Sequence, residues 1–177
     1  VFQYPLSGGL GHTFETLVQL CEEIPTVAAV KDWCNDPMLH EKHIRVLQNL
    51  ARPVNVLTTH SAWLMSSLVM GCNGLLSGAG SVIADLQVAL WRSVQKEDLA
   101  EAKKLNDQIY PMIQAFYAPP FLDMHNRMKE TAVLLGRLPK AVVRPPLCKL
   151  DDFEIGRLNA AIRDAGLSID GFVPQAA

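Results

Sequence analysis

Short runs of apolar, mostly β-branched residues alternate with amphipathic helical patterns in the first half of the chain. This alternation restricts the fold more than any other feature of the sequence. Each run is too short for a helix and is bounded by loop or polar residues, as buried strands are. Strands joined by helices are parallel and connected by right-handed crossovers. The pattern predicts an α/β fold, doubly wound or barrel, with strands over Val1–Tyr4, Val27–Lys31, Val54–Leu57 and Gly74–Ser77.

The helices between these strands have recognisable starts. Thr13 is placed to cap the helix that follows the first strand. Asp36-Pro37 is typical of a helix start, because aspartate caps and proline suits the first helical position. That helix should run to about Leu50. Ser61 is predicted to cap a third helix, Ala62–Met70.

From Ser81 onward the apolar pattern is wholly helical. Two helices are predicted first, and two more follow them. The third covers Asp123–Leu135, and the fourth runs from Asp151 to Gly166 and begins with Asp-x-x-Glu, which resembles a capping box. Four helices without an intervening strand predict a C-terminal bundle. We divide the chain into residues 1–95, with the half-barrel units and Lys31, and residues 96–177, the C-terminal helical region. The first two helices bury stripes formed by Ile83, Leu86, Leu90 and Val94, and by Ala102, Leu105, Ile109, Met112 and Phe116.

Composition and charge argue against several classes of protein. The 177 residues are 49% apolar and 19% charged, as in an ordinary folded domain. A net charge of -2 without basic runs gives no surface for nucleic acid or an anionic membrane. No stretch reaches the roughly 18 apolar residues of a membrane span, and the first residues of the sequence show no basic-then-apolar pattern of a signal peptide. Because Val1 already lies within a strand pattern, we expect a fragment of one larger domain.

The cysteines and histidines predict no metal site. The four cysteines form no CxxC pair, which indicates neither zinc nor disulfides and favours a reducing cytoplasm. His40 and His43 are three apart on a predicted helix and could share a metal in principle. No third ligand stands nearby in the sequence, so we interpret them as surface histidines. The cysteines are Cys21, Cys34, Cys72 and Cys148.

Lys31 ends an apolar run and is the best indication of function. An ammonium beside valines costs several kcal/mol unless it is paired, neutralised or used for chemistry. Val27, Ala29 and Lys31 share one strand face, and only Lys31 reaches the carboxyl end, where barrel active sites lie. A neutral lysine there can attack a ketone. The alternative is a strand-end lysine in a salt bridge with Asp32 or a loop carboxylate.

Other polar residues follow the neighbouring strand ends. Tyr4 can pass a proton to or from a lysine adduct, or it is simply a packed tyrosine. Thr59 and His60 end the third strand; His60 either orients a substrate hydroxyl, transfers a proton or fills a loop. The loop Gly74–Ser81 precedes a helix, whose N–H groups can hold a carboxylate, although tight turns explain many such loops.

Taken together, these residues resemble the dihydrodipicolinate synthase and N-acetylneuraminate lyase family. The resemblance rests on Tyr4, a lysine 27 positions later in Ala-Val-Lys-Asp, Val-Leu-Thr-Thr-His, Gly-Leu-Leu-Ser and the late Val-Arg-Pro-Pro-Leu. It covers the chain to about Leu167. It implies the C-terminal half of a TIM (β/α)8 barrel, with about four parallel strands and their helices, followed by a C-terminal helical bundle.

The resemblance also implies a class I mechanism. Lys31 would form a Schiff base with a small 2-oxo acid, and Tyr4 would shuttle protons. The iminium is an electron sink for proton loss or carbon–carbon cleavage. No cofactor or metal is implied. Full-length relatives are commonly tetramers, so a homo-oligomer is expected.

Within the family, Phe-Gln-Tyr-Pro, Val-Lys-Asp-Trp and Leu-Leu-Ser-Gly-Ala-Gly-Ser resemble the 2-keto-3-deoxy-sugar-acid dehydratases, in particular those acting on 2-keto-3-deoxy-L-arabonate. The product would be 2-oxoglutarate semialdehyde, with Thr59, His60, Ser77 and Gly78 around the sugar hydroxyls. Pro5 replaces the family's asparagine after Tyr4, which disfavours a synthase or a sialic-acid lyase. The open alternatives are a pyruvate-dependent aldolase or synthase, and a truncated, inactive α/β module.

Overall fold

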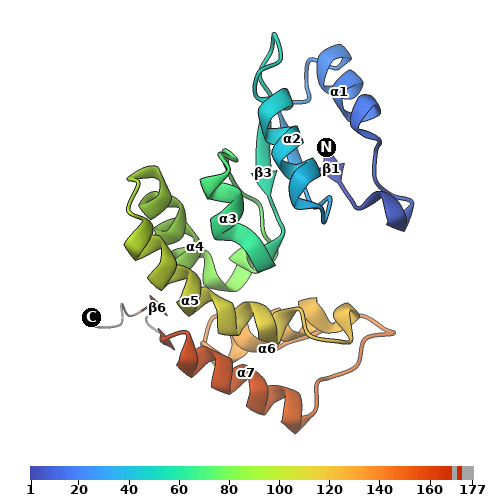
Figure 1. Cartoon of the computed structure of the whole chain (residues 1–177). Helices are drawn as coiled ribbons and strands as arrows, with labels where there is room; N and C mark the ends of the chain where they lie inside the picture. Colours follow the sequence, from blue (N-terminus) through green and yellow to red (C-terminus); the bar gives the residue numbers. More distant parts are fainter. Residues whose placement is uncertain (169–170, 173–177) are drawn as a thin grey trace. The chain divides into compact units, whose positions relative to one another are not determined.

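The computed structural model describes residues 1–168 and 171–172, the last two by their backbone alone. The chain forms two compact units, Val1–Gly78 and Ala79–Ala177 (Figure 1). The helix that begins after Ala79 groups with the later helices, and the division into residues 1–95 and 96–177 stays a prediction. Among the described residues, no helix combines the length and the apolar character needed to cross a membrane.

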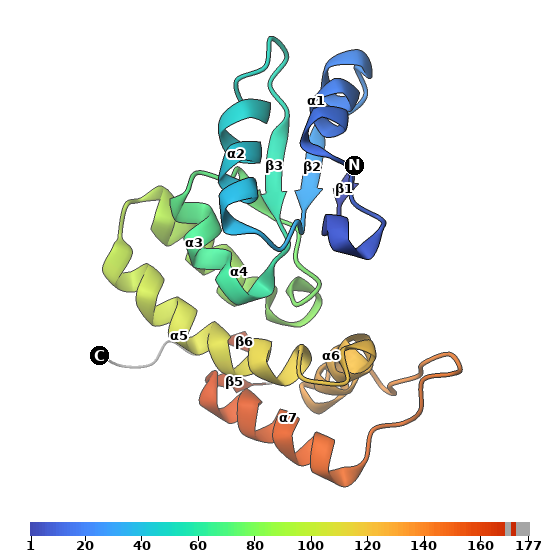
Figure 2. The ribbon, with the colours of Figure 1, turned by 45° about the vertical axis from the view of Figure 1, so that its right-hand side comes forward.

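A parallel sheet of four strands forms the centre of the first unit. The strands lie in chain order, and Lys31 pairs with Phe2 on one side and Leu57 on the other. Figure 2 shows strands of this sheet side by side. The predicted parallel strands are therefore confirmed, although each is shorter than or shifted from its predicted range. They are β1 (Phe2–Gln3), β2 (Ala29–Asp32), β3 (Asn55–Thr58) and β4 (Gly74–Leu75).

The helices of the first unit occupy the expected connections. Thr13 Oγ1 accepts the Thr16 N–H, and the Asp36 carboxylate accepts two N–H groups of the next turn, so both predicted caps are confirmed. The second helix ends at Leu47 rather than near Leu50. The helices are η1 (Leu6–Gly8), α1 (Phe14–Glu23), α2 (Pro37–Leu47), η2 (Ser61–Trp63) and α3 (Leu64–Val69).

The predicted cap at Ser61 is wrong. The chain after β3 first makes the 3₁₀ turn η2, and α3 begins only at Leu64 without a side-chain cap. The Ser61 hydroxyl instead forms a hydrogen bond with the Ser77 hydroxyl, with 2.9 Å between the oxygens. A serine before an apolar run is ambiguous, because its oxygen can serve a tertiary partner as easily as a backbone N–H.

Burial alternates along β2, as a strand between two different environments requires. Val30 and Asp32 are buried, whereas Ala29 and Lys31 are partly exposed. The buried side is the one facing α2, which lies against β3 and packs beside α1 (Figure 2). The core of this unit is completed by apolar residues of the helices and β3, including Leu17, Cys21, Ile44, Leu47, Val56, Leu64 and Leu68.

The second unit consists of packed helices and one short strand pair. The predicted stripe from Ala102 to Phe116 is fully buried on the second helix, whereas on the first helix Val94 is partly exposed. The strand pair at the end was not predicted. The elements are α4 (Gly80–Gln95), α5 (Leu99–Phe116), η3 (Phe121–Asp123), α6 (Met124–Leu134), α7 (Asp152–Asp164), β5 (Leu167–Ser168) and β6 (Gly171–Phe172), the last two antiparallel.

Arg127, on α6, is the largest fully buried side chain of the described residues. Its Nε donates to Glu154 of α7 at 2.8 Å. The remaining guanidinium nitrogens donate to backbone carbonyls at the end of α5 and in the segment between α5 and η3, so the buried charge is paired and hydrogen-bonded. These carbonyls belong to Phe116, Ala118, Pro119 and Pro120.

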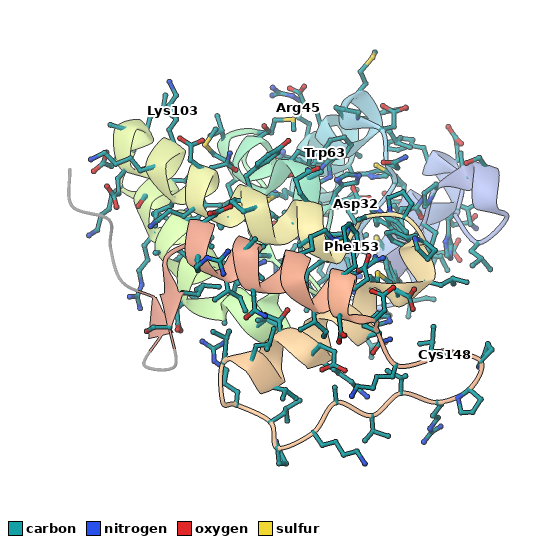
Figure 3. The ribbon with its side chains drawn as sticks, turned by 90° about the horizontal axis from the view of Figure 1, so that it is seen from below. Asp32, Arg45, Trp63, Lys103, Cys148 and Phe153 are labelled. Carbon is teal, nitrogen blue, oxygen red and sulfur yellow. The ribbon has the colours of Figure 1, made fainter. Side chains whose placement is uncertain are left out.

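The four cysteines are free. Cys21, Cys34 and Cys72 are buried, whereas Cys148 is exposed on the long connection between α6 and α7 (Figure 3).

Candidate active site

The six predicted site residues all belong to the first unit and lie at the carboxyl ends of its strands. Lys31 is the penultimate residue of β2, and Tyr4 follows β1 directly. The others follow β3 and β4 and are Thr59, His60, Ser77 and Gly78. Because the strands are parallel, these ends meet at one edge of the sheet, which is where ligands of open and closed α/β sheets bind.

Lys31 lies among apolar neighbours. Its register partners Phe2 and Leu57 stand on the same face of the sheet, and its Nζ lies 4.3 Å from the centroid of the Phe2 ring. In the part of the chain that the structure describes, Lys31 makes no ion pair. The predicted alternative of a salt bridge with Asp32 is wrong, because the Asp32 carboxylate is buried against α2 on the opposite face.

Tyr4 belongs to an aromatic group next to Lys31. Its ring centroid lies 4.0 Å from that of Phe2 and 5.6 Å from that of Trp33, the second in an edge-on arrangement. The Tyr4 carbonyl is held by the Gln3 amide at 3.2 Å. The Phe2 ring therefore contacts both Lys31 and Tyr4, and it brings the two predicted catalytic residues into one side-chain group.

His60 is fixed by two neighbours. Its Nε2 lies 2.7 Å from Asn35 Oδ1, an acceptor, so Nε2 carries the proton and donates it. The ring stacks on Trp63, with 3.9 Å between centroids. Burial lowers the pKa of His60 below its ordinary value of 6.5. Because Nε2 donates to Asn35, the lone pair is on Nδ1, which is buried and has no hydrogen-bond partner among the described residues.

The other predicted binding residues are only partly defined by contacts. The Thr59 N–H donates to the Asp32 carbonyl at 3.1 Å, which continues the pairing of β2 and β3 past Thr58. Ser77 shares a hydrogen bond with Ser61, so two hydroxyls lie beyond the ends of β3 and β4. A substrate role for Thr59, Ser77 and Gly78 stays a prediction.

Behind Lys31, on the face of the sheet turned to α2, lies a buried polar cluster. The Asp32 Oδ2 atom accepts hydrogen bonds from His40 Nδ1 at 2.8 Å and His43 Nδ1 at 2.7 Å. Its Oδ1 accepts the Cys34 N–H at 2.9 Å. Both histidines are 1% exposed or less, so our interpretation of them as surface residues is wrong. The helical spacing is correct, but it turns both rings inward to a carboxylate.

This network controls the ionisation of Asp32. Burial by itself would raise the pKa of the Asp32 carboxyl, but the hydrogen bonds from His40 and His43 outweigh burial and lower that pKa well below its ordinary range. The carboxylate is therefore ionised at neutral pH. Burial raises the pKa of the neighbouring Cys34 thiol to about 12, with a further contribution from the Asp32 charge.

The sequence patterns do not predict several residues that the structure places in this region. Phe2 and Trp33 flank the predicted catalytic pair, and Asn35, with a φ of 59°, holds His60. From its place next to Lys31, Asp32 is predicted only as a salt-bridge partner of that lysine. Strand alternation was the available signal, because it places consecutive residues on opposite faces and so separates Asp32 from Lys31.

Comparison with known proteins gives a consistent result. Residues 1–165 match the family described as the dihydrodipicolinate synthetase family. An uncharacterized DapA-like lyase of Halobacterium salinarum is 28% identical over 168 residues, which are 94% of this chain and 52% of that protein. A 4-hydroxy-tetrahydrodipicolinate synthase of Nitratidesulfovibrio vulgaris is 26% identical, over 94% of this chain and 55% of that protein. The chain thus spans about half the length of these relatives.

The fold agrees with this match. A prophage protein of the dihydrodipicolinic acid synthase family from E. coli K12, solved in complex with pyruvate, superposes with a TM-score of 0.82 at 21% identity. The superposition covers 93% of this chain and 54% of that one. The four parallel strands and their helices therefore have the fold of about half of a solved chain of this family.

Proposed function

Because the chain belongs to the dihydrodipicolinate synthetase family, we propose that Lys31 is the Schiff-base lysine of a class I lyase that acts on a 2-oxo acid. The observation that carries the proposal is the position of Lys31 at the carboxyl end of β2, between Phe2 and Leu57 and without an ion-pair partner among the described residues. Schiff-base formation needs the neutral amine as the nucleophile, and in the described residues no carboxylate holds the Lys31 Nζ away from a substrate carbonyl. The pyruvate bound by the E. coli protein is itself a 2-oxo acid.

The first step joins the substrate to the enzyme. The neutral Lys31 amine attacks the C2 carbonyl of the 2-oxo acid, and one water molecule leaves as the iminium forms. Tyr4 is the residue we assign to the proton transfers, since its ring packs on the same Phe2 side chain as Lys31. The iminium then withdraws electrons from the C2–C3 region, which makes a C3 proton removable.

We propose dehydration of a 2-keto-3-deoxy sugar acid, such as 2-keto-3-deoxy-L-arabonate, as the reaction that follows. The C3 proton leaves to give an enamine, and the enamine electrons then expel the C4 hydroxyl as water. Rearrangement and hydrolysis of the imine release 2-oxoglutarate semialdehyde and restore Lys31. Support comes from the polar groups at the strand ends, where His60 is held by Asn35 and Ser61 and Ser77 supply hydroxyls. Thr59 and Gly78 complete the proposed substrate contacts.

The second candidate is a pyruvate-dependent aldolase or synthase of the same family. It is favoured by the match to the 4-hydroxy-tetrahydrodipicolinate synthase of Nitratidesulfovibrio vulgaris. The third is a truncated module without activity, since the chain spans about half of its relatives. We also propose that the protein assembles into a homo-oligomer and that it is cytoplasmic. The four free cysteines support the cytoplasmic location.

Borohydride trapping tests the Schiff base. Two preparations are compared: the chain alone, and the chain mixed with the half of the Nitratidesulfovibrio vulgaris relative that it does not match. Each is incubated with pyruvate or 2-keto-3-deoxy-L-arabonate and then reduced with borohydride. We expect one reduced adduct, located on Lys31 by peptide mass spectrometry. Lys42 is the matched control, because its Nζ also lies over a phenylalanine ring, 3.6 Å from that of Phe14. Absence of an adduct in both preparations, or equal labelling of Lys42, contradicts the proposal.

Product analysis separates the two enzyme candidates. Dehydration gives a semialdehyde that a coupled dehydrogenase oxidises, whereas carbon–carbon cleavage gives free pyruvate. Pyruvate as the main product from 2-keto-3-deoxy-L-arabonate would exclude the dehydratase and leave the aldolase.

A further inference from the structure

A cavity of about 370 Å³ opens in the second unit, where the start of α4 packs against α6. Its volume lies within the range of about 300–1,000 Å³ that is usual for small-molecule pockets. Three segments line it, namely the start of α4, one face of α6 and the turn that follows α6. All of them belong to the unit Ala79–Ala177, so the cavity is complete within one compact part of the chain.

The interior of the cavity is apolar. Val82 of α4 and Met128 and Ala132 of α6 line it, and each of these side chains is less than a tenth exposed. Met128 and Ala132 are four positions apart, which places them on the same face of the helix. Leu138, in the turn after α6, adds a partly exposed apolar side chain. These residues form a surface suited to a hydrocarbon or aromatic group.

The polar lining of the cavity is basic. His125 and Lys129 project from the same face of α6, and Arg137 comes from the following turn. All three are exposed, and none of them makes an ion pair among the described residues. No aspartate or glutamate lines the cavity. Because an unbalanced pair of full positive charges lies beside apolar surface, the site favours an anion.

The turn that carries Arg137 is fixed by its own backbone. Gly136 has a φ of 68° and donates its N–H to the Val133 carbonyl at 2.9 Å, and the Arg137 N–H donates to the Ala132 carbonyl at 2.8 Å. This pair of hydrogen bonds is the Schellman arrangement that ends a helix with glycine. The turn therefore holds Arg137 next to the last part of α6, and the site is already formed without a ligand.

Both cations are positioned by backbone carbonyls and keep donors for a ligand. An Arg137 Nη1 donates to the Val82 carbonyl, next to Ile83, where non-helical dihedral angles kink α4. Lys129 Nζ donates to the Val142 carbonyl at 2.6 Å. A guanidinium has five N–H donors and an ammonium has three, so further donors remain on each side chain.

We propose that this cavity binds a small carboxylic acid with an apolar body. The carboxylate accepts hydrogen bonds from Arg137 and Lys129, since the planar guanidinium fork matches the two oxygens of a carboxylate. The apolar body lies against Val82, Met128 and Ala132. The proposal is independent of the Schiff-base chemistry of Lys31, because no residue of the cavity belongs to the first unit.

Calorimetric titration of the full chain with 3-phenylpropionate tests the proposal. We expect one equivalent to bind. The matched amide, 3-phenylpropionamide, keeps the apolar body but loses the charge, and it should bind about tenfold more weakly, as expected for the loss of a charge-assisted hydrogen bond. Acetate keeps the charge but loses the apolar body, and it should also bind more weakly than 3-phenylpropionate. Absence of binding by 3-phenylpropionate, or equal binding by the amide, overturns the proposal.

Methyl NMR locates the bound probe. In a chain labelled at the methionine methyl groups, the ring of 3-phenylpropionate should shift the signal of Met128, which is assigned from Met128→Leu. Met112 is the control, because it is a buried methionine of the same unit that does not line the cavity. Equal shifts of the two signals, or no shift of Met128, would place the probe elsewhere and overturn the proposal.

Charge variants identify the residues that hold the carboxylate. Lys129→Met and Arg137→Met should each weaken 3-phenylpropionate binding by about fivefold or more. Lys103→Met should leave it unchanged, because Lys103 is an exposed lysine of α5 outside the cavity. Circular dichroism confirms that each variant folds, and all three positions are exposed. Unchanged binding by both cavity variants, or an equal loss in Lys103→Met, contradicts the proposal.

Discussion

Lys31 and Asp32 are consecutive in β2, yet their side chains lie in opposite environments. Lys31 Nζ lies over the Phe2 ring on the partly exposed face of the sheet, whereas Asp32 is 1% exposed and accepts hydrogen bonds from α2. The pleat of the strand produces this separation. It gives the amine an apolar surrounding and gives the carboxylate a structural role.

Replacing Lys31 by methionine should remove Schiff-base trapping and leave stability almost unchanged. Lys31 has no ion pair among the described residues, and methionine keeps its apolar contacts with Phe2 and Leu57. We expect the free energy of unfolding to stay within about 1 kcal/mol of the wild type or to rise slightly, as at other functional positions. Urea denaturation measures it, with Lys42→Met as the control. A loss above about 3 kcal/mol would show that Lys31 is mainly structural.

Replacing Asp32 by asparagine should be strongly destabilising. The change removes the charge that two buried imidazole groups and one N–H donate to, and hydrogen bonds to a charged group contribute about 1.5–3 kcal/mol each. We expect a loss of about 3 kcal/mol in urea denaturation. Asp36→Asn is the matched control, because Asp36 caps α2 and asparagine caps equally well. Similar losses of stability in both variants would contradict the stabilising role of the Asp32 charge.

The pH dependence of stability should contain a contribution from His60. Burial holds its folded-state pKa below the ordinary value of 6.5, so the unfolded chain binds a proton more tightly in that range. The contribution is complete above pH 6.5 and is lost as the pH falls from 6.5 towards the lower folded-state pKa. Urea denaturation of wild type and His60→Gln from about pH 8 to about pH 5 should therefore show a shallower decline in the variant. A steeper decline of stability in His60→Gln would mean that the folded state does not lower the pKa of His60.

Replacing Arg127 by methionine should unfold or severely weaken the second unit. Arg127 is fully buried and paired with Glu154, and breaking a buried pair costs about 3–5 kcal/mol because it leaves the partner uncompensated. Arg157 also binds Glu154 but is 31% exposed, so Arg157→Met should cost about 1 kcal/mol or less. Thermal unfolding followed by circular dichroism compares the two. Equal losses would show that burial of Arg127 is not the deciding factor.

The sequence alone determined the local elements and their order. Alternating apolar runs indicated four parallel strands, and Thr13, Asp36 and Asp151 indicated helix starts that the structure contains. These features are encoded within a few residues of one another, so reading along the chain suffices. The order of strands and helices along the chain was also enough to place the predicted site residues at one edge of the sheet, because parallel strands bring their carboxyl ends together.

Only the tertiary structure decided what the polar residues contact. His40 and His43 were interpreted as surface residues because their spacing shows a helical face but not what that face meets. Ser61 was interpreted as a cap, and its partner is Ser77, 16 positions away. Proximity in the chain allows a salt bridge of Lys31 with Asp32, and the pleat of β2 excludes it by placing the two side chains on opposite faces. Contacts between distant segments depend on the packing of strands and helices, which local pattern does not encode.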